Sequence, residues 1–110
     1  MVIDMSKATS VDFAKALADA TRQQIMRLCC CEWISVNDIV AKTSVAQPTV
    51  SHHLAILREA GLVHVREEGR QTFYMLDQDK VVDCCGRLMA VFAPERKTTG
   101  EVIKLTDAKT

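Results

Sequence analysis

The chain has 110 residues, of which 48% are hydrophobic and 25% are charged, and its formal net charge at neutral pH is zero. These values indicate one globular domain over residues 1–110 and exclude a disordered or fibrous chain. A zero net charge excludes a general attraction to polyanions, so any nucleic-acid surface must be made locally. No window approaches the roughly 20 apolar residues of a membrane span, and the N-terminus has no signal-peptide pattern, so we expect a cytoplasmic protein without a membrane partner.

The first two helices are predicted over residues 11–20 and 19–31, where apolar residues recur at helical spacing. The second of these helices runs through three consecutive cysteines. A third helix is predicted over 35–42, with Ser35 as its N-cap.

A longer helix is predicted over residues 47–60, with Pro48 in its first turn and Gly61 at its C-terminal end. The apolar period then changes from 3.6 to two, which predicts a β-hairpin over 62–76 that turns at Gly69.

The last helix is predicted over residues 79–94, where apolar side chains again recur at helical spacing and Pro94 ends the pattern. Residues 95–110 are polar and are expected to form a loosely attached tail. The folded core is therefore expected over 11–94.

Helix, short turn, helix and hairpin is the order of a winged helix-turn-helix, a mainly α fold with a β-hairpin wing. The second helix of such a unit enters the major groove with its N-terminal residues leading. Short polar side chains there reach phosphates or base edges, and arginines of the wing contact phosphates or the minor groove. The candidates for DNA contact are Gln47, Thr49, Ser51 and His52 on the helix, and Arg66 and Arg70 on the wing.

The chain resembles the ArsR/SmtB family of small dimeric repressors over residues 11–93. The motifs are A-L-A-D-x-T-R at 16–22, Q-P-x-V-S-x-H-L-x-x-L-R-x-A-G-L-V at 47–63 and G-R-x-x-x-Y at 69–74. The resemblance implies a homodimer built by the first and last helices, bound to a palindromic operator and released from it by an inducer. We do not expect an enzyme, because the chain has no Gly-rich phosphate loop and its histidines lie far along the chain from every cysteine.

The inducer sites familiar in this family are not matched here. They comprise the C-x-C of arsenic and cadmium sensors, the carboxylates and histidines of zinc sensors, and the cysteine pair of persulfide sensors. The corresponding positions hold Ser35 and Asn37, then Gln78, Lys80, Val91 and Pro94, and finally Arg27 and Ala93.

The five cysteines form a run, Cys29–Cys31, and a pair, Cys84 and Cys85. Disulfide scaffolds space their cysteines apart, and adjacent cysteines rarely bridge, so we expect thiols that serve soft metals or redox chemistry. Cys29 lies at core spacing. Cys30 and Cys31 share a helical face with position 27, which faces the last helix in relatives, so they are expected to meet the pair there.

One of Cys84 and Cys85 is expected to point inward and the other toward a flank of the last helix. Adjacent cysteines on the terminal helix also resemble the arrangement in some arsenic-responsive relatives. As(III) and Sb(III) are held by three thiolates, and soft thiolates select them over magnesium, calcium or zinc. We therefore predict that As(III), as inducer, bridges Cys84 and Cys85 to Cys30 or Cys31, with no other cofactor required.

Three alternatives remain open at the level of sequence. The two cysteine clusters could instead be linked by a disulfide or polysulfide, which would make the protein a redox- or persulfide-responsive repressor. Another soft metal ion could take the place of As(III). The winged helix could also serve only protein–protein contact, with its cysteines filling the core.

Overall fold

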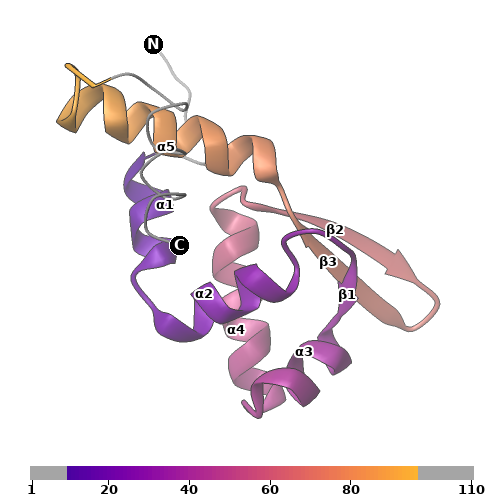
Figure 1. Cartoon of the computed structure of the whole chain (residues 1–110). Coiled ribbons are helices and arrows are strands. Elements are labelled where there is room, and N and C mark those ends of the chain that lie inside the picture. Colours follow the sequence, from indigo (N-terminus) through magenta and orange to yellow (C-terminus); the bar gives the residue numbers. More distant parts are fainter. Residues whose placement is uncertain (1–9, 97–110) are drawn as a thin grey trace, which may run out of the picture.

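The computed structural model describes residues 10–96, which form five helices and three strands (Figure 1). The predicted winged helix-turn-helix is confirmed, with α3 (Val36–Thr43) and α4 (Gln47–Glu59) as the helix-turn-helix and β2 (Val63–Glu68) and β3 (Gln71–Leu76) as the wing. Residues 97–110, which make up most of the predicted tail, lie outside the described residues. The elements are α1 (Ser10–Leu17), α2 (Ala20–Leu28), β1 (Ile34–Ser35), α3 (Val36–Thr43), α4 (Gln47–Glu59), β2 (Val63–Glu68), β3 (Gln71–Leu76) and α5 (Gln78–Phe92).

Local sequence signals account for the helix-turn-helix. The Ser35 hydroxyl accepts the backbone N–H of Asp38 at 3.1 Å and so caps α3, as predicted. Pro48 lies in the first turn of α4. Gly61 follows α4 with φ +75°, a left-handed conformation that favours glycine and stops the helix.

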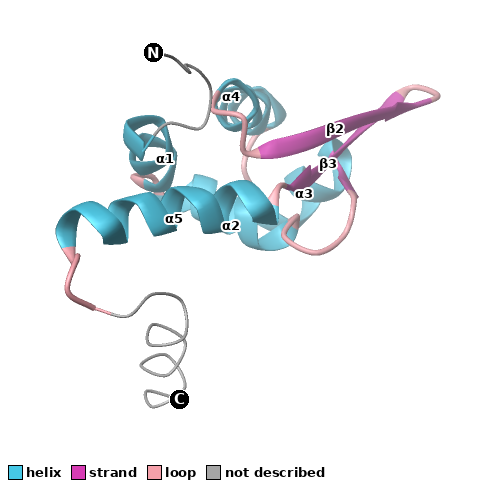
Figure 2. Cartoon of the chain, turned by 90° about the horizontal axis from the view of Figure 1, so that it is seen from above, coloured by secondary structure: helices cyan, strands magenta, loops and turns pink. Residues whose placement is uncertain are grey.

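The sheet has the strand order β1-β3-β2, and both pairings are antiparallel. The β2–β3 hairpin turns at Gly69, as predicted, and extends away from the helices (Figure 2). The strand β1 was not predicted, because two residues are too few to show a period of two. It is held by pairing with β3, where Ile34 lies opposite Tyr74 and both side chains are buried.

Helix α2 ends at Leu28, so the prediction that it runs through Cys31 was wrong. Cys29 is its C-cap. The carbonyl of Cys29 accepts the backbone N–H of Leu76 at 2.8 Å, which ties the end of α2 to the end of β3. Cys30 and Cys31 therefore lie outside the helix and cannot share a helical face with Arg27. The local sequence pattern could not show this, because the N–H that binds the Cys29 carbonyl comes from Leu76, far along the chain.

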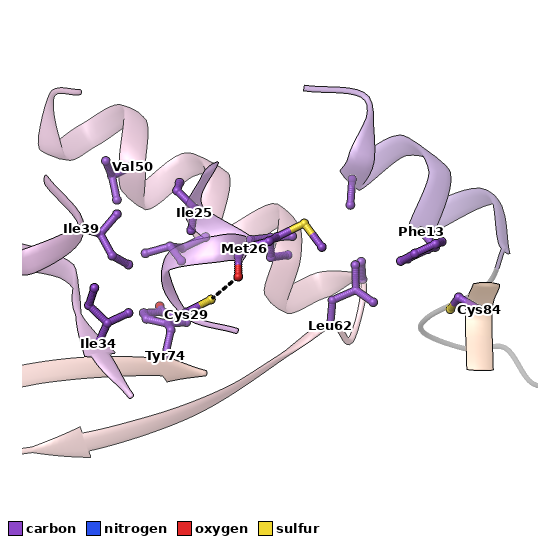
Figure 3. Packing of buried hydrophobic residues seen from close by; sticks show 14 residues of the cluster. Phe13, Ile25, Met26, Cys29, Ile34, Ile39, Val50, Leu62, Tyr74 and Cys84 are labelled. Carbon is purple, nitrogen blue, oxygen red and sulfur yellow. Dashed lines mark hydrogen bonds between the residues drawn. The ribbon is translucent and has the colours of Figure 1, made fainter. Parts of the chain in front are cut away.

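The core lies between the helices and the inner face of the sheet (Figure 3). Cys84 joins this cluster from α5 and lies beside Phe13 of α1, so it belongs to the contact between the first and last helices. Apolar side chains of α1 and α5 also remain exposed, namely Val11, Val82, Val91 and Phe92. Within residues 10–96, no helix is both long and apolar enough to cross a bilayer.

Candidate DNA-binding surface and cysteine sites

The N-terminal half of α4 presents all four predicted DNA-contacting side chains to solvent. Gln47, Thr49, Ser51 and His52 are exposed, whereas Val50, between them, is fully buried. This alternation follows from the helical period, which turns Val50 toward the core and the polar residues outward.

A groove of about 280 Å³ lies between this part of α4 and the wing. Gln47 and Ser51 line it from α4 and Arg70 from the turn of the hairpin. Asn37 of α3 and Gln71 of β3 also line the groove, and the sequence argument did not identify them. The only signal for Gln71 was its place beside Arg70, and Asn37 had none, since the hairpin's position relative to α3 is a tertiary feature.

Arg66, the other predicted wing residue, has partners within the chain. Its Nε lies 3.1 Å from Glu68 Oε2, and its guanidinium carbon lies 4.5 Å from the centre of the Trp33 ring and 5.5 Å from that of Phe73. These contacts hold the guanidinium against the sheet. Of the two wing arginines, Arg70 is therefore the one that lines the groove beside α4.

The adjacent residues His52 and His53 have different environments. His52 is exposed, whereas His53 is 8% exposed and packs in the core. Nη1 of Arg22 lies 3.1 Å from His53 Nδ1. Because an arginine N–H only donates, the ring accepts through Nδ1 and carries its proton on Nε2, which lies 4.0 Å from Asp19 Oδ1.

Arg22 also connects α4 to the first two helices. Its Nε donates to the carbonyl of Ala16 at 2.9 Å and its Nη2 to that of Lys15 at 3.1 Å, both at the end of α1. The Asp19 carboxylate caps α2 by accepting the Arg22 backbone N–H at 3.0 Å, which lowers the pKa of Asp19. The motif A-L-A-D-x-T-R thus supplies both a helix cap and the side chain that holds the centre of α4 in place.

Cys29 has the core role predicted for it. Its side chain is fully buried, its thiol donates to the Met26 carbonyl at 3.8 Å, and burial raises the pKa of the Cys29 thiol to about 11. A protonated, inaccessible thiol is a poor nucleophile and a poor metal ligand, so this residue acts in packing.

Cys30 and Cys31 are joined by a disulfide, contrary to the expectation that adjacent cysteines would remain thiols. They lie in the turn that follows α2, where the chain is no longer helical. The side-chain amide of Gln78, in the first turn of α5, donates to the Cys30 carbonyl at 2.7 Å and approaches Cys31 Sγ at 3.8 Å. These two cysteines therefore do lie against the last helix, but at its N-terminal end.

A pocket of about 230 Å³ lies beside this disulfide, and we call it the Cys30–His64 pocket. Its lining includes Cys30 and Cys31, His64 of β2, and Asp77 and Gln78 at the start of α5. His64 is far from every cysteine along the chain, but the fold brings it beside Cys30 and Cys31, because β2 begins beside the end of α2. Sequence distance gave no signal of this proximity.

Cys84 and Cys85 lie elsewhere on α5. Cys84 is fully buried and Cys85 is exposed, which confirms that one points inward and the other outward. Cys84 lies six positions after Gln78 on the helix, a rise of about 9 Å. Burial raises the pKa of the Cys84 thiol. Among residues 10–96, no group of three His, Cys, Asp or Glu side chains is placed to hold a metal ion, so the four predicted cysteine ligands are not gathered into one site.

Comparison with known proteins places the chain in a family. Residues 19–65 match the family described as bacterial regulatory protein, arsR family. The chain is 47% identical over 62 residues to the biofilm growth-associated repressor of Agrobacterium fabrum, a match that covers 56% of this chain and 53% of that protein. It therefore spans about half the length of that relative.

Solved structures share the fold. HlyU from Vibrio cholerae is 31% identical with a TM-score of 0.64, and the match covers 76% of this chain and 91% of that one. A possible transcriptional regulator for arsenical resistance is 26% identical with a TM-score of 0.66, covering 90% and 97% of the two chains. The chain belongs to the ArsR family of bacterial regulatory proteins, which are DNA-binding transcriptional regulators rather than enzymes.

Proposed function

We propose that this protein is a homodimeric transcriptional repressor that binds operator DNA through α4 and the wing and leaves it when its cysteines react. The observation that carries the DNA-binding half is the exposed polar face of α4 beside a groove that Arg70 lines. The name of the Agrobacterium relative supports a repressor. Contacts through Gln47, Thr49, Ser51 and His52 would read the major groove, with Arg70 and Arg66 on the wing.

A second copy of the chain would cover the apolar side chains that α1 and α5 expose. Val11 is 62% exposed and Phe92 is 79% exposed, and Val82 and Val91 are similarly open. Exposed apolar side chains on two packed helices favour a protein partner. A dimer formed there would present two α4 helices to the two half-sites of a palindromic operator.

We propose As(III) as the inducer, bound first by the thiolates of Cys30 and Cys31 in the reduced protein. Two adjacent, accessible sulfurs supply two of the three soft ligands that this ion takes. The third thiolate, from Cys84 or Cys85, lies more than one turn further along α5. Recruiting it would displace α5 from its present place and so change the dimer, which couples inducer binding to loss of DNA affinity.

Oxidation is the second candidate signal, and the disulfide between Cys30 and Cys31 favours it. One peroxide molecule would oxidise the two thiols to this disulfide and be reduced to two molecules of water. Because the pair contacts Gln78 at the start of α5, a change in its redox state would also act on α5, which is expected to form part of the dimer interface.

DNA release under defined conditions separates the two signals. The operator is first selected by the protein from a random duplex library, and its affinity is measured by fluorescence anisotropy. Low-micromolar arsenite is expected to release the reduced protein, and excess dithiol to restore binding. If arsenite leaves binding intact while peroxide or tetrasulfide releases the protein, the arsenic proposal is wrong and the redox proposal stands; failure to select any DNA would contradict both.

Arg70→Ala is expected to weaken binding to all DNA sequences by a similar factor. It should also reduce the magnitude of the slope of log affinity against log salt concentration by about one. The reason is that a guanidinium beside α4 would neutralise one phosphate. Arg66→Ala is the matched control on the same hairpin, and its effect should be smaller because that guanidinium packs on Trp33. Equal salt slopes for Arg70→Ala and the parent protein would contradict a phosphate contact.

A further inference from the structure

We infer that Arg66 positions the wing for DNA through a contact with Trp33 at the entry of α3, and that it keeps this contact in the DNA complex instead of binding a phosphate. The inference rests on the proposed operator binding and deepens it at one residue, for which the sequence predicted a direct contact with DNA. Arg66 is thus a positioning residue, and Arg70 is the wing residue that reaches the DNA.

The contact lies on the outer face of the sheet. Ile34 and Tyr74 form one cross-strand row and are buried in the core. Successive side chains of a strand point to opposite faces, so Phe73 and its partner Arg66 in the next row point away from the core. The guanidinium carbon of Arg66 lies 4.5 Å from the centre of the Trp33 ring and 5.5 Å from that of Phe73. Because β3 separates β2 from β1, the Arg66 side chain reaches across a whole strand to the residue that precedes β1.

The same contact lies where the sheet changes from three strands to two. Within residues 10–96, β1 pairs with β3 only at Phe73 and Tyr74, so the rows nearer the turn, at 67–72, have no third strand. A hairpin of two strands is marginally stable by itself, and Arg70 lies in its turn. Arg66, opposite Phe73, is therefore in the last row of the wing that β1 supports.

Trp33 connects the wing to the helix-turn-helix. It lies two residues before Ser35, whose hydroxyl caps α3 and whose backbone pairs opposite Phe73. Figure 1 shows that β1 leads directly into α3. The Arg66–Trp33 contact therefore joins the free part of the hairpin to the fixed start of α3. Without it the wing would have to be ordered during DNA binding, which costs affinity.

The guanidinium of Arg66 already has partners other than DNA. Its Nε lies 3.1 Å from Glu68 Oε2, in addition to its contacts with the two rings. A phosphate would have to replace these contacts, and the Glu68 carboxylate beside the guanidinium would repel it. Arg70, by contrast, lines the groove beside α4. The geometry thus separates one arginine that holds the wing from one that faces the DNA-binding groove.

The direct test uses the fluorescence of Trp33, the only tryptophan of the chain. Quenching by acrylamide reports how open the ring is, and the Arg66 guanidinium covers part of it. We expect stronger quenching in Arg66→Ala than in the parent chain. The parent bound to its selected operator should be quenched no more strongly than the free parent. Arg70→Ala, the matched control on the same hairpin, should be quenched like the parent.

Two outcomes of this measurement would overturn the inference. The first is equal quenching in the free parent and in free Arg66→Ala, which would mean that the guanidinium does not cover the ring. The second is quenching of the parent that rises on DNA binding to the level of Arg66→Ala, which would mean that Arg66 leaves Trp33 for the DNA. The comparison of the parent with and without DNA needs no variant and so does not depend on how a variant folds.

A double-mutant cycle on operator affinity tests the positioning role. Trp33→Leu and Arg66→Ala should each weaken binding by about two- to fivefold, the value of one exposed cation–π contact, and the double variant should lose no more than either. The slope of log affinity against log salt concentration should stay that of the parent, because no phosphate contact is lost. Trp33→Phe keeps an aromatic ring under the guanidinium and should recover most of the affinity.

Losses that multiply in the double variant, or a salt slope reduced by about one in Arg66→Ala, would show a direct phosphate contact and overturn the inference. Either result would leave the proposed operator binding standing, because the parent chain would still bind DNA. Failure of the parent chain to select any DNA would instead contradict the proposed function and the inference with it.

Discussion

Replacing Cys30 and Cys31 together by serine is expected to give a protein that stays on its operator in the presence of arsenite or peroxide. Both proposed signals act through this pair, which is the one adjacent, accessible set of sulfurs in the described part of the chain. The parent protein should lose roughly 5–150-fold in operator affinity on induction, the usual range of allosteric coupling. In the variant that change should fall below about twofold.

The substitution is not expected to disturb the fold. The Cys31 side chain is exposed, that of Cys30 is partly buried, and the bond from Gln78 goes to a backbone carbonyl that serine retains. Circular dichroism and operator affinity without inducer check this point.

The matched control is Cys84→Ala/Cys85→Ser. Alanine is chosen at position 84 because this side chain is fully buried and alanine adds no polar group to the core. This variant should lose the arsenite response, which needs a third thiolate, and keep the peroxide response, which does not. Normal induction of Cys30→Ser/Cys31→Ser by both reagents would place the sensing chemistry elsewhere.

Arg22→Ala is expected to lower the free energy of unfolding by about 2–4 kcal/mol. The substitution removes donors to His53 and to the carbonyls of Lys15 and Ala16, and the imidazole that loses its partner is largely buried. Urea unfolding, monitored by circular dichroism, should show a lower midpoint, while the dependence of the free energy of unfolding on urea concentration stays the same. Operator affinity should also fall, because Arg22 holds the buried His53 in place. The residue before it, His52, lies on the exposed face of α4 that is proposed to read DNA.

Two variants test the reason for this effect. Arg22→Lys keeps the charge but cannot reach three acceptors at once, so it should recover less than half of the lost stability. Arg27→Ala removes an exposed arginine from the same helix and should change the stability by less than about 0.5 kcal/mol. If Arg22→Ala and Arg27→Ala have the same unfolding midpoint, the proposed link between α1, α2 and α4 is wrong.

The sequence was sufficient wherever a local signal decides the structure. Ser35, Pro48 and Gly61 mark helix ends through their own hydrogen-bonding or backbone properties, so the helix-turn-helix was predictable. The hairpin was predictable because its period of two and its glycine turn are likewise local. Helical spacing also assigned Cys29 to the core and distinguished the environments of Cys84 and Cys85.

Only the tertiary structure decided where α2 ends and which residues surround the cysteine pair. The carbonyl of Cys29 binds Leu76, which is distant in sequence, so Cys30 and Cys31 leave the helix and meet Gln78 rather than Cys84. The proximity of His64 follows from the same junction, because it depends on strand pairing. The amino-acid pattern thus determined the helices, apart from the end of α2, the β2–β3 hairpin and the family. The neighbours of the reactive sulfurs depended on long-range backbone hydrogen bonds, whose partners a local pattern does not specify.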